Sequence, residues 1–197
     1  THGGTLAAGQ NVTVSAKRID ASATSLFAAG LQSDGSLGSS GALTLSAAET
    51  LIAHGRNLAA GAATLHAASL DLSASQTTAR VMDLQATAGL LDTRQAILNA
   101  DETLTLRAGG QLDNRHGSLS AARLDVQAHS LDNTDGELLH TGSDAMSLLL
   151  PGELTNNGGR IASNARALRL GATTLDNTGG RIEHAGTGSL EIRSQNL

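Results

Sequence analysis

The chain has 197 residues, no cysteine and one aromatic side chain, Phe27, so its apolar interior must be built from Leu, Ile, Val and Ala. The hydrophobic fraction of 40% is too high for a disordered chain, and the missing cysteines exclude disulfides and thiolate metal sites. The net charge of -5 argues against nucleic acid, which is bound by neutralising its phosphates. This composition favours many small, similar layers over one irregular core.

The N-terminal quarter of the chain contains weak strand signals around a polar interruption. Val12 and Val14 alternate with polar residues, which is the period-2 pattern of a strand with one buried face. Ile19 and Leu26 lie seven residues apart, a step that recurs further along the chain. Residues 30–41 are rich in Gly and Ser, which predicts an irregular coil or a loop.

A leucine then recurs with a period of about 21 residues, at intervals of 19 to 23 residues. These leading residues are Leu51, Leu70, Leu91, Leu112, Leu131, Leu154, Leu175 and Leu197. A second aliphatic residue follows most of them after seven positions, namely Leu58, Leu98, Leu119, Leu138, Ile161 and Ile182. After Leu70 the same step reaches only Thr77. A fixed period of this length is typical of a repeat architecture.

The repeats in the second half of the chain also contain strand signals and turn signals. The strand signals are the alternating pairs Leu104/Leu106, Leu124/Val126, Met146/Leu148, Leu168/Leu170 and Leu190/Ile192. The turn signals are Asn114, Asn133, Asn156 and Asn177, with Gly117, Gly136, Gly159 and Gly180. We interpret these Asn and Gly residues as turn formers that tolerate the left-handed conformation. Stacked side-chain amides can also hydrogen-bond one another, which is the alternative interpretation of the Asn positions.

A unit of about 21 residues with short strands and no helical period predicts an all-β fold in which each unit is one coil of a β-solenoid. Nine such coils, stacked at about 4.8 Å, would form a rod of about 45 Å. A leucine-rich repeat has a similar length, but its L-x-x-L-x-L core does not recur here. Because the chain begins with Thr1 and carries no signal peptide, we expect it to be a piece of a longer rod.

The recurring unit L-D-N-x-x-G-x-[LI], present in Leu131–Leu138 and Leu175–Ile182, resembles the haemagglutinin repeats of the filamentous haemagglutinin family. Gly3–Ala23 looks like another coil of this kind. The resemblance implies a right-handed parallel β-helix, export through an outer-membrane transporter of a two-partner secretion system, and adhesion. We expect one β-helical segment over 1–197, with irregular first coils in 1–50 and regular repeats in 51–197.

Candidate chemical groups are spread along the chain rather than gathered in a motif. The histidines are His2, His54, His66, His116, His129, His140 and His184. They form no pair at i, i+2 or i, i+4, so we expect them to be exposed and predict no metal site. Asp113, Asp132 and Asp176 share one repeat position and should stack along one edge. A catalytic group should occur once rather than once per coil, so we predict no catalytic residue, no cofactor and no enzyme.

A basic stripe is the one binding feature that the sequence predicts. Arg160 and Arg181 share a repeat position, and Arg166, Arg169 and Arg193 are close in sequence. Such a stripe could bind sulfated glycans, which the resemblance implies as ligands. The alternative, which we favour, is that these arginines are solvated and balanced by acidic residues, namely Glu137, Glu153, Glu183 and Glu191.

The function that follows is a structural and adhesive rod segment of a secreted bacterial surface protein that attaches to host cells. Its expected partners are host-cell glycans or receptors and, during export, the outer-membrane transporter. We expect no nucleic acid partner and no membrane insertion, because no apolar run is long enough to span a bilayer. The alternatives are the stalk of a contact-dependent growth inhibition exoprotein and a β-helical polysaccharide-degrading enzyme.

Overall fold

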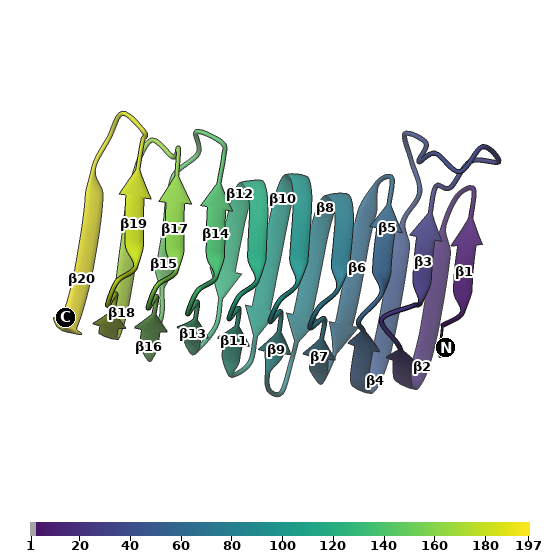
Figure 1. Ribbon diagram of the computed structural model, residues 1–197, viewed down its shortest axis with the longest axis horizontal. Helices are drawn as coiled ribbons and strands as arrows, with labels where there is room; N and C mark the ends of the chain where they lie inside the picture. Colours follow the sequence, from purple (N-terminus) through teal and green to yellow (C-terminus); the bar gives the residue numbers. More distant parts are fainter. Residues whose placement is uncertain (1–2) are drawn as a thin grey trace.

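The computed structural model describes residues 3–197, which form one sheet of twenty strands. Strands pair in parallel with their equivalents in the preceding and following coils, so the chain winds into a solenoid of nine coils (Figure 1). The predicted parallel β-helix with about 21 residues per coil is therefore confirmed. The described residues contain no helix, and hence none that could span a membrane.

Three ladders of paired strands form three faces of the rod. The first face contains β1 (Thr5–Ala8), β3 (Leu26–Ala29), β5 (Arg56–Ala59), β14 (Glu137–His140), β17 (Arg160–Ser163), β19 (Arg181–His184) and the first halves of β8 (Gln76–Ala86), β10 (Ile97–Ala108) and β12 (Ser118–Gln127). The second face contains the second halves of those three strands, β6 (Ala62–Ala67), β15 (Met146–Leu149) and the beginnings of β2 (Val12–Ala21), β4 (Leu43–Ala53), β18 (Leu168–Asp176) and β20 (Leu190–Asn196). The third face contains the remaining parts of those four strands, β7 (Ser69–Asp71), β9 (Leu91–Asp92), β11 (Gln111–Asp113), β13 (Ser130–Asp132) and β16 (Glu153–Thr155).

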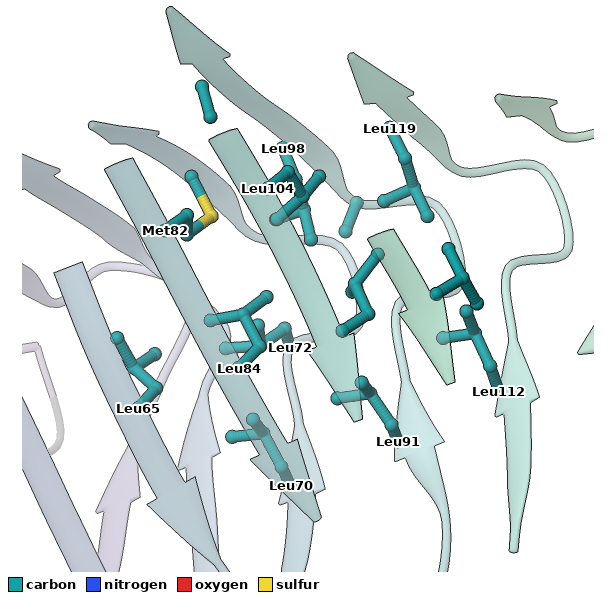
Figure 2. Close-up of a cluster of buried hydrophobic side chains, with 14 of the residues drawn as sticks. Leu65, Leu70, Leu72, Met82, Leu84, Leu91, Leu98, Leu104, Leu112 and Leu119 are labelled. Atoms are coloured by element: carbon teal, nitrogen blue, oxygen red, sulfur yellow. The ribbon is translucent and has the colours of Figure 1, made fainter. Parts of the chain in front are cut away.

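The core is a set of aliphatic rows that run parallel to the rod axis. The row of leading residues pairs coil to coil on the third face, from Ile19 through Leu51 and Leu112 to Leu175. All of these side chains are buried. Figure 2 shows leucines of several rows, including Leu91 and Leu112, pointing into the shared interior. The predicted period and its register on this face are confirmed through Leu175, whereas Leu197, the last predicted member of the row, is exposed.

The seven-residue step from the leading residue was wrong in the first coils. Phe27, not Leu26, occupies the inward position after Ile19, and Asn57, not Leu58, occupies it after Leu51. The corner before β5 is shorter by one residue than the corner before β8, because it closes tightly at Gly55. A Cβ on Gly55 would lie 2.1 Å from the carbonyl oxygen of Ser25.

A buried polar pair results from this change of register. Asn57 donates a hydrogen bond of 3.0 Å to the hydroxyl of Thr77, and both side chains are fully buried in a row that is otherwise apolar. The Oδ1 atom of Asn57 is buried without a hydrogen-bond partner in the described part of the chain. This part of the core therefore contains a polar atom whose hydrogen-bonding capacity is not satisfied.

The corner between the first and second faces differs along the rod. In the second coil it contains residues 30–42, which form no strand and project from the rod (Figure 1). A single antiparallel bridge joins Leu31 to Leu37 there, so the predicted loop is confirmed. In the middle coils, β8, β10 and β12 cross this corner without interruption. From β14 onward a short loop replaces the continuous strand at this corner, as Figure 1 shows above β14, β17 and β19.

Candidate functional site

The corner that joins the third face to the first face of the next coil, here called the Asn corner, contains a hydrogen-bonded row of side chains. The amide of Asn114 donates to Asn133 over 2.7 Å, Asn133 donates to Asn156 over 2.7 Å, and Asn156 donates to Asn177 over 2.6 Å. The hydroxyl of Thr93 donates to Asn114 over 3.0 Å and begins the row. The amide row is therefore confirmed, and the interpretation of these residues as turn formers alone is wrong.

The left-handed residue of each Asn corner is not the Asn itself. It lies two positions later, at His116, Asp135, Gly158 and Gly179, with φ angles of 57, 53, 64 and 66°. Ala74 and Gln95 adopt the same conformation in earlier coils. The residue after the left-handed one does not share this conformation but approaches the backbone of the preceding coil. In two of the coils this residue is Gly136 and Gly159. A Cβ at these two positions would lie 2.3 and 2.1 Å from the carbonyl oxygens of Asn114 and Asn133.

The acidic row stacks as predicted, and its carboxylates are used inside the turns. Asp113 pairs with Asp132, and Thr155 separates Asp132 from Asp176. In each case the carboxylate accepts the backbone N–H two residues later, at 3.3, 3.0 and 3.1 Å. Hydrogen bonds, first from the side chain of Asn157, hold the pKa of Asp176 below its usual value. A carboxylate therefore closes the turn in each of these three coils.

Two arginines that the sequence analysis did not single out connect neighbouring carboxylates of this row. Arg94 forms an ion pair with Asp92 and lies 3.7 Å from Asp113, while Arg115 pairs with Asp113 at 2.8 Å. The hydrogen bonds that Arg94 donates to Asp92, together with the negative charge of that carboxylate, raise the pKa of Arg94. The signal was present in the sequence, because an Arg follows the Asp by two positions in both coils. Alternating charges thus reinforce the Asn corner along the rod.

The histidines occupy different environments. His2 lies outside the described residues. His54, His66 and His116 lie 3.1, 3.6 and 3.8 Å from carboxylates of Asp71, Asp83 and Asp135, His129 is exposed, and His184 lies 2.7 Å from the carbonyl oxygen of Ala165. His140 is fully buried, so the expectation of exposed histidines is wrong at this position. Within residues 3–197, no three His, Cys, Asp or Glu side chains gather so as to hold a metal ion.

The predicted basic stripe is partly neutralised. Glu137, Arg160 and Arg181 lie in one row of the first face. Arg160 pairs with Glu137 at 2.7 Å and with Glu183 at 2.8 Å, and the hydrogen bond that it donates to Glu137 is the main reason why the pKa of Arg160 is raised. On the second face, Glu191 pairs with Arg169 and Arg193. Among the described residues of this stripe, Arg166 and Arg181 have no ion-pair partner.

A shallow groove lies along the corner between the second and third faces, with a volume of about 450 Å³. Gln85, Arg107 and Gln127 lie in one row at its edge, and His129 contributes to its lining. The guanidinium of Arg107 is held by Asp83 at 2.7 Å. The groove therefore offers mainly side-chain amides and one imidazole, which can form hydrogen bonds with hydroxyl groups.

The comparisons with known proteins agree with the coil architecture. The family model of the haemagglutinin repeat matches residues 1–31, 27–79, 59–122, 109–148 and 120–196. The chain is 35% identical over 182 residues to a Yersinia pestis protein named Toxin CdiA, and the match covers 86% of this chain and 6% of that protein. The chain thus spans only a small part of this relative. No solved structure matches. From the repeats over its whole length, the chain belongs to the haemagglutinin repeat family.

Proposed function

We propose that this segment is a length of the rod of a secreted, surface-exposed exoprotein of a two-partner secretion system, and that it acts as a spacer. The observation that carries the proposal is the run of nine coils whose three parallel ladders continue through the described chain. The haemagglutinin repeats and the similarity to Toxin CdiA support it. The export partner would be the outer-membrane transporter of such a system.

The physical basis of a spacer is its quasi-one-dimensional stability. Each coil contacts only its neighbours, so the free energy of unfolding is close to a sum of coil and interface contributions. Reach then grows with the number of coils, by about 4.8 Å for each one. A chain of this kind can also fold coil by coil as it emerges from a transporter, because every new coil finds a finished edge to pair with.

Deleting one coil in register tests the spacer proposal. Removal of residues 97–117 takes out the 21 residues between Ile97 and its register partner Ser118, so β8 can pair directly with β12. We expect the shortened chain to unfold cooperatively in urea, with the loss of only one coil's contribution. In the parent exoprotein, export should continue.

Removal of residues 97–111 is the control, because it deletes 15 residues instead of 21 and joins Ala96 to Leu112 out of register. This variant should lose β structure by circular dichroism and should be exported poorly. Equal behaviour of the two deletions would contradict a register-dependent rod. If the chain with the in-register deletion loses only its attachment to cells, the deleted coil contains a binding site and is not merely a spacer.

The similarity to Toxin CdiA favours the stalk of a contact-dependent growth inhibition exoprotein as the setting of this rod. Attachment to host-cell glycans or receptors is the second candidate function, and Arg181 is the observation that favours it, because no described residue neutralises this side chain. Sulfated glycans would be the matching ligands, because a guanidinium binds sulfate oxygens through charge-assisted hydrogen bonds.

Binding to sulfated glycans should distinguish the two settings when it is measured at low and high salt. If the segment is adhesive, Arg181→Ala should weaken binding about tenfold, as expected for loss of a charge-assisted hydrogen bond of about 1.5 kcal/mol. Arg160→Ala is the control, since this arginine lies in the same row but is held between Glu137 and Glu183. No binding by the unaltered chain would leave the segment as a spacer.

A further inference from the structure

His140 occupies a row of small side chains in the rod interior. Its register partners are Ala121 in the preceding coil and Ser163 in the following coil, and Ala100 lies one coil further back. The imidazole is fully buried. A titratable ring therefore stands where the middle coils place a methyl group.

The hydrogen bonds of this ring define its protonation state. The backbone N–H of Leu124 donates to Nδ1 of His140 over 3.3 Å, so Nδ1 is an acceptor and the ring proton of the neutral form lies on Nε2. Nε2 is buried without a hydrogen-bond partner in the described part of the chain. The only basic nitrogen of the neutral ring is thus already used by the backbone of the preceding coil.

The position of His140 in the coil gives this ring a structural consequence. β12 crosses the corner between the first and second faces without a break, whereas β14 ends at His140 and β15 begins at Met146. Backbone hydrogen bonds from Thr141 and Gly142 to the preceding coil, each 2.9 Å long, hold the loop 141–145 in place. β14 is the first strand after the continuous strands β8, β10 and β12 that ends at this corner, and His140 is its last residue.

We propose that His140 makes the corner 140–146 an acid-sensitive joint of the rod. Protonation of Nδ1 would place its new proton against the N–H of Leu124, so that this backbone group loses its acceptor. A buried imidazolium would also lack hydration. The ring must then leave the interior, and the loop that follows it opens while the other coils stay stacked, since each coil contacts only its neighbours.

The charged groups around the ring act in opposite directions. Burial lowers the pKa of His140 most strongly, and Arg123 of the preceding coil lowers it further, whereas the backbone and carboxylate of Asp144 raise it. Ser163, in the coil above, carries no charge. Because the folded-state pKa lies below the unfolded value of about 6.5, the folded corner binds fewer protons than the open one. Stability at this corner is complete above that value and falls as the pH drops below it.

Hydrogen exchange of the whole chain at pH 7 and pH 5, corrected for the intrinsic pH dependence of amide exchange, tests the proposal. At pH 5 the amides of Leu124 and 141–146 should open several-fold more often than at pH 7, while the amide of Leu51 keeps its protection. His140→Ala, which introduces the residue found at positions 100 and 121, should abolish the increase. His116→Asn, which removes an exposed histidine but keeps a residue that tolerates positive φ, should retain it.

The same increase in His140→Ala, or no increase in the unaltered chain, would overturn the proposal. If the alanine variant does not fold, a titration of the unaltered, ¹⁵N-labelled chain gives the decision. The ring nitrogens of His140 and the backbone amide of Leu124 should then titrate together, with a midpoint below about pH 6.5. A Leu124 signal that does not follow the ring would show that the two groups are not coupled.

Discussion

Replacing Gly159 with Ala should destabilise the rod by about 3 kcal/mol, the upper part of the range for overpacking. The new Cβ would lie 2.1 Å from the carbonyl oxygen of Asn133, which is a backbone atom of the preceding coil and cannot rotate away. The φ angle of Gly159 is not positive, so the expected cost is steric and arises between coils. Urea unfolding followed by circular dichroism measures it as a lower midpoint.

Gly179→Ala is the matched control because this glycine has the opposite combination of properties. Its φ angle is 66°, but a Cβ built on it would have no atom within 4 Å. The substitution should therefore cost only the backbone strain of one left-handed residue, about 1 kcal/mol. If both variants lose the same stability, conformational freedom rather than the close approach of coils explains the glycines of the repeat.

The glycines of the repeat also show which structural requirements the sequence did not reveal. The Gly residues of the repeat lie in turns as predicted, but the left-handed conformation expected of Gly117, Gly136, Gly159 and Gly180 was wrong, because none of them has a positive φ. One sequence pattern, Gly158-Gly159, contains two different physical requirements. The first Gly adopts a positive φ and the second allows backbone contact with the preceding coil. Nothing in a single repeat separates the two, because the second requirement exists only when the coils are stacked.

The aliphatic rows were predictable because their period is long and their residue type is uniform. The leading row was therefore found with its register on the third face. The position of Asn57 in the core was not found, because a corner shorter by one residue shifts the next strand without changing the hydrophobic pattern around it. Burial of His140 was missed for a related reason, since its row is inward-facing but is otherwise filled by small residues.

The sequence predicted where the arginines of the candidate binding surface lie, but not which of them are neutralised by ion pairs. Arg160 and Arg181 do lie in one row, as their shared repeat position implied. The neutralisation of Arg160 depends on Glu137, which is 23 residues away in sequence and one coil away in space. Pairing of this kind becomes visible only when the register of the coils is known, and it leaves Arg181 as the sharper test of adhesion.

Asn133→Ala should lower the free energy of unfolding by about 3 kcal/mol. The Asn133 amide accepts from Asn114, donates to Asn156 and donates to the carbonyl oxygen of Gly136, all at 3.1 Å or less, and the side chain is fully buried. Removal deprives the amides above and below of a partner in a site that water does not reach. Each buried group left unsatisfied costs about 1–3 kcal/mol. Urea unfolding of the whole chain measures the loss.

The row has a direction, which makes a double-mutant cycle informative. Every amide donates towards the C-terminal coil, and the hydroxyl of Thr93 starts the series. If Asn133 and Asn156 are coupled, Asn133→Ala with Asn156→Ala should cost less than the sum of the single variants, because the bond between them is counted once. Asn177→Ala should cost less than Asn133→Ala, since Asn177 has one neighbour in the described row rather than two. A connected row would be contradicted if the losses from Asn133→Ala and Asn156→Ala were additive and if Asn177→Ala cost as much as Asn133→Ala. These residues would then act only as separate turn formers.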